Sequence, residues 1–280
     1  MNPWLETAGV ALIAGLGVAL GGVSGRLRRP CWALGYVASL SLIALLVLGR
    51  CYPSLHFTRP YCWIVATRAR FLITALAITL GLSTPLSRLP RQWERAGMWL
   101  LMTGLVVRFS VLPFLLPALL GGRLAGLQTT IDGNGVCLQT TAYTCGPAAA
   151  VTALRRLGLP ADEGELAVLA HTNPVVGTLP ACLDKALRNR YASDGLACQY
   201  RRFDSLAELD SSDITLAIIH DAFLLDHCVA VLAVTHDTVT LADPYIGIRS
   251  MPCEQFENVW RSTGIALSRD ADPAHLELNL

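Results

Sequence analysis

Residues 136–158 read VCLQTTAYTCGPAAAVTALRRLG, and this stretch decides the fold of the C-terminal half of the chain. From Pro147 onward it predicts an α-helix, because proline suits the first position of a helix and Gly158 supplies a stop signal at the other end. Apolar residues recur on one face of this helix, at Val151, Leu154 and Leu157. Cys145 is therefore expected just before the start of a helix.

This position makes the thiol of Cys145 a candidate nucleophile. The unpaired backbone N–H groups and the dipole at a helix N-terminus favour a thiolate over a thiol. Gly146 is expected to leave the approach to the sulfur open. A thiolate of this kind is the nucleophile of acyl-transfer chemistry. Structural cysteines also precede helices, so the assignment requires a general base elsewhere in the chain.

Residues 227–243 predict a β-hairpin that brings a histidine and an aspartate together. His227 opens a run of small and β-branched residues, a polar turn follows, and the returning strand ends at Asp243. A turn centred on residue 236 places Asp243 opposite residues 228–229, beside His227. A carboxylate at that place holds an imidazole in the tautomer and orientation that a general base requires.

Two other histidines, His220 and His236, are alternative bases. His236 lies in the predicted turn and is expected to face solvent, and His220 has no evident carboxylate opposite it. Asp221 and Asp226 are interpreted as loop acids. His227 is therefore the predicted base, although the sequence also permits it to begin an ordinary strand.

Three motifs carry a family resemblance. They are Gln139-x5-Cys145-Gly146-Pro147-Ala148, then Asp226-His227-Cys228-Val229-Ala230-Val231, then Leu241-Ala242-Asp243-Pro244-x2-Gly247. In order and spacing the chain resembles the double-glycine leader peptidases, which are papain-like cysteine peptidase domains attached to bacteriocin-exporting ABC transporters and also found in stand-alone proteins. The resemblance covers residues 130–268 and includes the closing Phe256…Trp260 segment.

The resemblance implies roles for four residues. Cys145 would be the nucleophile, His227 the general base and acid, and Asp243 the orienting group. Gln139 would donate a hydrogen bond to the oxyanion, an interaction that contributes about 3–4 kcal/mol to a transition state. Thr144 departs from the family, which often has an acid before the cysteine. The apolar spans also precede the peptidase region instead of following it, so leader specificity rests on analogy.

The remaining elements predict an α+β domain of helices packed on an antiparallel sheet. Asp162-x-x-Glu165 is a capping box that opens a short helix, and residues 178–190 form an amphipathic helix. Residues 214–220 form an apolar strand. By the resemblance, the Gly177-Thr178 pair lines the substrate cleft.

The two halves of the chain differ in charge. Residues 1–123 contain 12 arginines, no lysine and two acids, a net charge of +10, whereas residues 124–280 contain 10 basic and 19 acidic residues, a net charge of −9. Only 15% of all residues are charged, against about 25% in an ordinary soluble domain. A membrane part followed by a water-soluble part is predicted. The arginines flank apolar runs without interleaved aromatics, so no nucleic-acid binding is expected.

Four apolar stretches predict a bundle of transmembrane helices, with three spans as the alternative. They are residues 4–23, 31–49, 71–85 and 96–120. The first two approach the roughly 20 residues that a bilayer-spanning helix needs. The third requires arginine side chains that reach the interface, and the fourth, with Arg108, Pro113 and Pro117, requires a kink or a re-entrant geometry.

Arginine counts differ little between the two sides of the membrane. The first and third loops carry six, and the second loop and the following tail carry five. With four spans the two ends of the bundle share a side, and the count favours the outer side for the peptidase domain.

The nine cysteines contain no CxxC pair and no regular spacing, so neither a zinc site nor a disulfide framework is predicted. His220, His227 and Cys228 match no known ligand spacing. The chain has no GxxxxGK[ST] motif, so no ATP binding is expected. We predict no metal and no cofactor.

Together these patterns predict a cysteine peptidase anchored in the cytoplasmic membrane. It would cleave a peptide bond in the leader of a small secreted peptide, through an acyl-thioester, with the lipid bilayer and a separate export system as partners. A non-catalytic leader-binding module, and an amidase or acyltransferase with the same triad, are the alternatives. The expected domains are a membrane part at 1–123, a linker at 124–135, a peptidase domain at 136–270 and a tail at 271–280.

Overall fold

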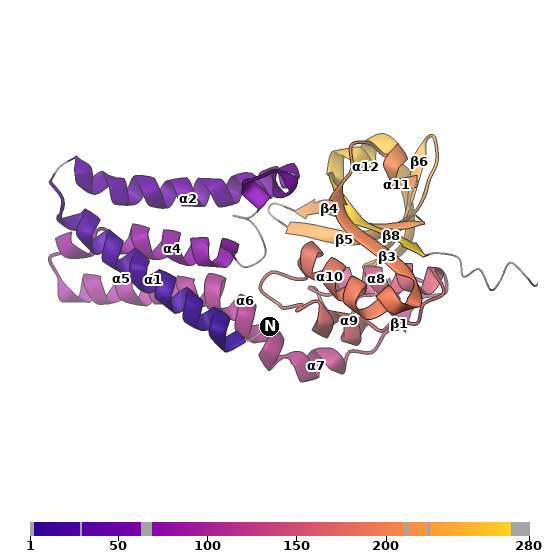
Figure 1. Cartoon of the computed structure of the whole chain (residues 1–280), viewed down its shortest axis with the longest axis horizontal. Coiled ribbons are helices and arrows are strands. Elements are labelled where there is room, and N and C mark those ends of the chain that lie inside the picture. Colours follow the sequence, from indigo (N-terminus) through magenta and orange to yellow (C-terminus); the bar gives the residue numbers. More distant parts are fainter. Residues whose placement is uncertain (1–2, 29, 63–68, 211–212, 223–224, 270–280) are drawn as a thin grey trace, which may run out of the picture. The chain divides into compact units, whose positions relative to one another are not determined.

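The computed structural model describes residues 3–28, 30–62, 69–210, 213–222 and 225–269. The chain divides into two compact units, Met1–Leu119 and Leu120–Leu280 (Figure 1). The predicted tail at 271–280, and Arg29 and Arg68 of the arginine count, lie outside the described residues. Segment 124–135, expected to be a linker, contains the end of a short helix and a strand of the second unit.

Among its described residues, the first unit contains helices and the loops between them, and no strand. Its α-helices are α1 (Pro3–Arg26), α2 (Leu34–Cys51), α4 (Ala69–Ser83), α5 (Gln92–Val106) and α6 (Leu112–Leu119). The 3-10 turns η1 (Cys31–Ala33), η2 (Pro53–Phe57) and η3 (Leu86–Arg88) and the π-helical segment η4 (Val107–Val111) connect or extend them. Within the part of the chain that the structure describes, four helical segments are long and apolar enough to cross a membrane, which agrees with the predicted four.

The fourth of these segments runs through α5, η4 and α6 as 28 residues of helix, Gln92–Leu119. The π-helical segment lies just before Pro113, whose ring and missing N–H disturb the regular ladder of an α-helix. The helix therefore changes pitch locally before Pro113 and continues without a break to Leu119, and whether this segment is re-entrant in a membrane stays a prediction.

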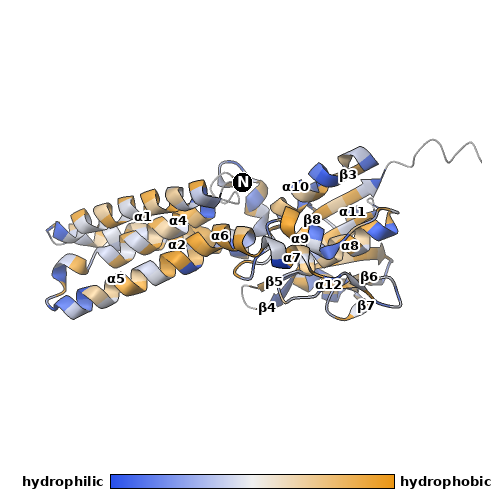
Figure 2. Cartoon of the chain, turned by 90° about the horizontal axis from the view of Figure 1, so that it is seen from below, coloured by the Kyte–Doolittle hydropathy of each residue, from blue (hydrophilic) through white to orange (hydrophobic). Residues whose placement is uncertain are grey.

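Helix α4 packs against α1, α2 and α5. On α1, Gly17, Gly21 and Gly25 are buried against α4 and the turn that follows it. At Gly21 a Cβ would lie 2.8 Å from the backbone oxygen of Leu80, so only glycine permits this approach. Helix interfaces in membranes are enriched in such small residues because they let backbones come close. The outer faces are apolar, as the orange along these helices in Figure 2 shows.

The second unit has an antiparallel six-stranded sheet in the order β3-β8-β4-β5-β6-β7. Its strands are β3 (Leu196–Arg202), β4 (Ile214–Ala222), β5 (Leu225–Val234), β6 (Thr238–Asp243), β7 (Gly247–Pro252) and β8 (Trp260–Arg269). A small hairpin of β1 (Thr130–Ile131) and β2 (Cys137–Leu138) precedes it. The helices are α7 (Gly121–Ala125), α8 (Cys145–Arg156), α9 (Glu163–Leu169), α10 (Pro180–Tyr191), η5 (Ala192–Asp194), α11 (Ala207–Asp210) and α12 (Cys253–Val259). The predicted α+β class is confirmed.

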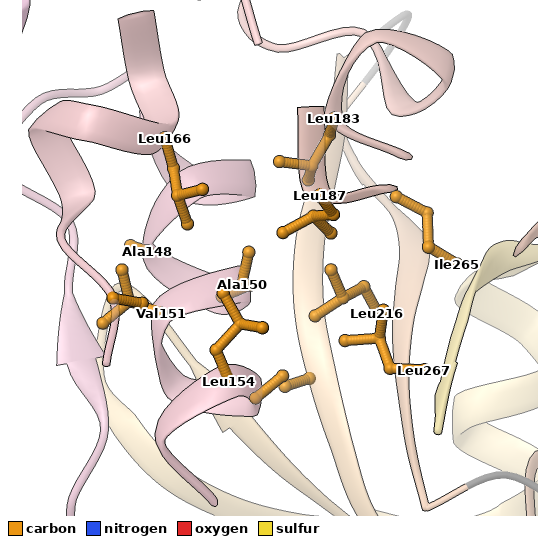
Figure 3. Packing of buried hydrophobic residues seen from close by; sticks show 14 of the residues in the cluster. Ala148, Ala150, Val151, Leu154, Leu166, Leu183, Leu187, Leu216, Ile265 and Leu267 are labelled. Carbon is orange, nitrogen blue, oxygen red and sulfur yellow. The ribbon is translucent and has the colours of Figure 1, made fainter. Parts of the chain in front are cut away.

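Both faces of the sheet are buried, which explains the continuous apolar runs in β4 and β5. On one face, Leu216 of β4 and Ile265 and Leu267 of β8 meet the apolar sides of α8, α9 and α10 (Figure 3). On the other face, Val229 of β5 and the neighbouring strands pack against Phe256 of α12. The alternation of a strand thus sends successive residues into two different cores.

Candidate active site

Cys145 is the first residue of α8, with Thr144 at the N-cap position. The helix begins two residues earlier than predicted, because the first turn of a helix has no internal acceptors for its N–H groups and Pro147 is tolerated at the third position. Thr144 is fully buried, and its Oγ1 accepts from the Thr141 N–H (3.1 Å) and donates to the Thr141 carbonyl (3.0 Å). This turn holds Cys145, which is partly exposed, at the edge of a helix whose next nine residues are all buried.

Gly146 lies against the loop that precedes α10. It is buried, and a Cβ at this position would lie 3.1 Å from Cβ of Thr178 and 3.4 Å from Cδ2 of Leu183. The glycine therefore lets this loop pack close beside the nucleophile, and its expected role in keeping the sulfur accessible stays a prediction. Thr178 is fixed in turn by a 2.7 Å hydrogen bond between its hydroxyl and that of Thr172. The predicted Gly177-Thr178 segment thus lies against the start of α8.

His227 and Asp243 form a buried pair, with Nε2 of the ring 2.8 Å from Oδ1 of the carboxylate. Each residue is only 4% exposed. Ala230 of β5 pairs with Ala242 of β6, so the next step of the register puts Asp243 opposite Val229. The hairpin predicted from the sequence is confirmed in its register, although a bulge after Val231 shifts the pairing nearer the turn.

Three further contacts hold the site around Asp243. The Tyr245 N–H donates to Oδ1 of the carboxylate (2.9 Å), Nε of Arg249 lies 3.3 Å from Oδ2, and the carbonyl of Asp243 accepts from the Ile246 N–H (3.2 Å). Burial alone would raise the pKa of Asp243, but the bonds from His227 and Tyr245 and the charge of Arg249 outweigh burial and lower it. Asp243 is therefore held as a carboxylate beside the ring. No sequence pattern pointed to Arg249, because its place depends on the β6–β7 register.

The ring of Tyr245 stacks on that of His227, with centroids 4.4 Å apart and planes 16° from parallel. Tyr245 lies in the turn after β6 and is about half exposed, so it covers the imidazole on its solvent side. This contact also escaped prediction, since a single aromatic residue in a turn carries no pattern.

His227 is poised to be cationic. Burial by itself would lower the pKa of the imidazole, but its hydrogen bonds with Asp243 and with the sulfur of Cys145 raise that pKa to about 9. The three predicted side chains thus meet: a sulfur at a helix start, a ring within hydrogen-bonding reach of it, and a carboxylate behind the ring. Such a set supplies a sulfur nucleophile, a base and a carboxylate that orients the base.

Gln139 is joined to the same site through its backbone. Its N–H donates to the carbonyl of Pro244 (3.0 Å), directly after Asp243. Its side-chain Nε2 donates to the carbonyl of Thr141 (2.7 Å), and its Oε1 is buried without a hydrogen-bond partner among the described residues. An amide nitrogen carries two protons, so one remains for a further acceptor. The predicted oxyanion role of Gln139 stays a prediction.

The alternative bases lie in less suitable places. His236 is 97% exposed at its side chain and pairs with Asp237 in the turn. His220 is exposed, and the expectation that it lacks a carboxylate opposite was wrong, because it pairs with Asp226 across β4 and β5. Asp226, however, is bound by Arg261, whose Nε and Nη2 both lie 3.0 Å from its Oδ1. Neither histidine has a buried carboxylate and a cysteine beside it.

The second unit has relatives among known proteins. Two are uncharacterized proteins, one of Methanothermobacter thermautotrophicus (29% identity over 52% of this chain and 96% of the relative) and one of Methanothermobacter marburgensis (30% identity, with the same coverage). Similar solved structures include the peptidase domain of Streptococcus ComA, a bi-functional ABC transporter involved in quorum sensing (19% identity, 48% of this chain and 96% of that domain, TM-score 0.41). Another is a double glycine motif protease of an AMS/PCAT transporter in complex with the leader peptide (21% identity, 51% and 99%, TM-score 0.40).

The family assignment rests on the sequence of the same region. Residues 134–272 match the Peptidase C39 family, and this range holds Gln139, Cys145, His227 and Asp243. The predicted family resemblance is therefore confirmed. The chain belongs to the peptidase C39 family. The part that matches the family is the cysteine peptidase domain, and it lies within the second unit of the chain.

Proposed function

We propose that this protein is a membrane-anchored peptidase that cleaves a peptide bond in the leader of a small secreted peptide, using Cys145 as nucleophile. The observation that carries the proposal is the meeting of the three side chains: His227 is hydrogen bonded to Asp243 at 2.8 Å, and the sulfur of Cys145 is near enough to the ring to raise its pKa. A raised pKa on the ring and a lowered pKa on the carboxylate both favour the charged pair on which thiolate attack depends.

The proposed reaction follows from this arrangement. The thiolate of Cys145 attacks the scissile carbonyl, and the oxyanion is bound by the free N–H groups at the start of α8 and the amide of Gln139. The imidazolium of His227 gives its proton to the leaving amine, and an acyl-thioester remains on the sulfur. The neutral ring then takes a proton from water, which hydrolyses the thioester. Asp243 orients the ring throughout.

The first unit supports the membrane part of the proposal. Of the large hydrophobic side chains that are exposed among the described residues, 22 belong to residues 3–119 and four to residues 120–269. Soluble proteins rarely expose a contiguous apolar surface of this kind, whereas a lipid-facing helix must. We propose that four spans lie in the cytoplasmic membrane, that the peptidase domain faces the outer side, and that a separate system exports the substrate.

The test uses the full chain in lipid nanodiscs and a leader peptide that ends in Gly-Gly followed by a fluorogenic amide. Wild type should release the fluorophore, and Cys145→Ala and His227→Ala should not, while His236→Ala, in the exposed turn, should behave as wild type. Cleavage by Cys145→Ala at the wild-type rate would eliminate the proposal. Binding of the peptide without product would favour the leader-binding module, and transfer of the acyl group to an added amine would favour the acyltransferase.

A further inference from the structure

A buried carboxylate of the second unit takes no part in the chemistry described above. Glu163, the first residue of α9, is 0% exposed. Burying a charged group is costly unless it is fully hydrogen bonded. Both oxygens of Glu163 bond to one residue, Thr140: Oε1 accepts from its backbone N–H (2.9 Å) and Oε2 from its hydroxyl (2.6 Å).

Thr140 does not need Glu163 to satisfy its hydrogen-bonding groups. It is exposed, so water could satisfy both its N–H and its hydroxyl at little cost. A buried charge that binds an exposed residue at two points instead fixes where that residue lies. Its neighbour is Gln139, whose N–H is bonded to the carbonyl of Pro244. The segment is thus tied to the end of β6 on one side and to α9 on the other.

Glu163 is itself firmly placed. Its N–H donates to the hydroxyl of Thr129 (2.8 Å), and that hydroxyl donates to Oδ2 of Asp162 (2.7 Å). The next residue, Gly164, lies so close to α7 that a Cβ would be 2.6 Å from the carbonyl oxygen of Leu124. The anchor therefore cannot shift along the helix without breaking several contacts.

We infer that Glu163 is a positioning residue of the peptidase, which holds Gln139 at the oxyanion site through Thr140. The inference rests on the proposed function, because it gives Gln139 a role in the transition state. The nearer the donor is kept to the position of the oxyanion, the less reorganisation is needed when charge develops there. Loss of the anchor should therefore slow acylation and leave the thiolate itself unaffected.

The experiment compares three variants of the full chain in nanodiscs on the fluorogenic Gly-Gly leader peptide. Glu163→Ala should lower kcat about 10- to 100-fold with little change in KM, the range expected when a catalytic group is misplaced by about 1 Å. Glu163→Gln should retain most activity, since an amide can accept from the Thr140 N–H and donate to its hydroxyl. Glu165→Ala is the matched control, because this carboxylate lies on the same helix, is 41% exposed at its side chain and pairs only with Arg190 among the ion pairs of the described residues.

Two readouts separate positioning from a merely structural role. Alkylation of Cys145 by iodoacetamide forms no oxyanion, so its rate should be equal in wild type and Glu163→Ala. In a Gln139→Ala background, adding Glu163→Ala should lower kcat by less than about twofold, because the amide that Glu163 positions is already absent. Multiplicative losses in the double variant, or equal slowing of alkylation, would overturn the inference.

The outcomes also distinguish the inference from the function beneath it. If wild type does not cleave the peptide, the proposed function fails; if wild type cleaves and Glu163→Ala matches Glu165→Ala, the inference alone fails. Should Glu163→Ala not fold, Thr140→Val removes the hydroxyl, with its 2.6 Å bond to Glu163 and its 3.3 Å bond to the Gln128 carbonyl, and keeps the backbone bond to Glu163. It should then lower kcat severalfold without changing the alkylation rate, and an unchanged kcat would count against the inference.

Discussion

Among the described residues, the buried polar residues of 3–119 carry neutral hydroxyls, whereas those of 120–269 include ionisable side chains. The first set is Ser39, Thr79, Ser83, Thr84 and Ser110. The second set includes Glu163, Asp184, His227 and Asp243. Four of these five hydroxyls bond to backbone carbonyls, as Ser39 does to Ala77 of the neighbouring helix at 2.7 Å, and the hydroxyl of Ser110 has no partner among the described residues. In the second unit, the ionisable groups bond to side chains or to backbone N–H groups.

The difference teaches what each unit is built for. Where α1 and α4 pack together, glycines of α1 face small hydroxyl residues of α4, because large side chains would keep the two helices apart. In a lipid environment these hydroxyls need hydrogen-bond acceptors within the protein. In the second unit the burial of a large apolar core offsets the free energy needed to bury a few ionisable groups. These groups include the His227–Asp243 pair beside Cys145. The polar residues buried between helices thus lie in the first unit, and the buried ionisable residues that include the His227–Asp243 pair lie in the second unit.

The largest effect should come from removing the charge of a buried carboxylate in the second unit. Asp243→Asn keeps the shape but cannot stabilise an imidazolium, so kcat/KM for the leader peptide should fall about 10²- to 10⁴-fold. The matched control is Asp226→Asn, one residue before His227, where the lost partner is Arg261 on β8. Equal losses in the two variants would mean that the His227–Asp243 pair is structural.

The next effect tests the apolar core. Leu216→Ala leaves a cavity between β4 and the helices in front of it and should cost about 2–5 kcal/mol of unfolding free energy. Leu16 of α1 is 49% exposed, so Leu16→Ala creates no cavity. This substitution should leave the unfolding temperature unchanged in detergent micelles. A comparable loss at Leu16 would show that the outer face of α1 is packed against protein.

The buried ion pair should make stability depend on pH. The pKa of His227 is raised from 6.5 to about 9, so folding favours the protonated ring. The stabilisation is complete below pH 6.5 and is lost as the pH rises through 9. One pKa unit corresponds to about 1.4 kcal/mol, which gives at most about 3 kcal/mol. Thermal unfolding between pH 6 and 10 should show a decline in wild type that is shallower in His227→Gln. Parallel curves would contradict the charged ring.

Short-range patterns sufficed for much of this site. The turn near residue 236 set the register of β5 and β6, and with it the meeting of His227 and Asp243, because a hairpin leaves few pairings open. The predicted start of α8 was two residues late, since proline is permitted at any of the first positions of a helix.

Contacts made by folding could not be predicted in the same way. Glu163 meets Thr140 across 23 residues of sequence, and Tyr245 covers His227 only because the β6–β7 turn folds back. The packing role of Gly146 escaped prediction for a similar reason: the loop that packs on it precedes α10 and is distant in the sequence. None of these partners lies in a periodic pattern, so only the tertiary structure brings them together.

The smallest effect concerns the close approach of α1 and α4, where two adjacent glycines differ. A Cβ on Gly21 would meet Ser83 and the backbone of Leu80, whereas a Cβ on Gly22 would have nothing within 4 Å. Gly21→Leu should force the helices apart and cost about 1–3 kcal/mol, while Gly22→Leu should be neutral or slightly stabilising, because leucine favours helix and meets only the surroundings of the bundle. Unfolding temperatures of the two variants in the same micelles provide the measurement. If Gly22→Leu lowered the unfolding temperature more than Gly21→Leu, α1 would pack through the face that carries Gly22. The face that carries Gly21 would then not be the packing surface of α1.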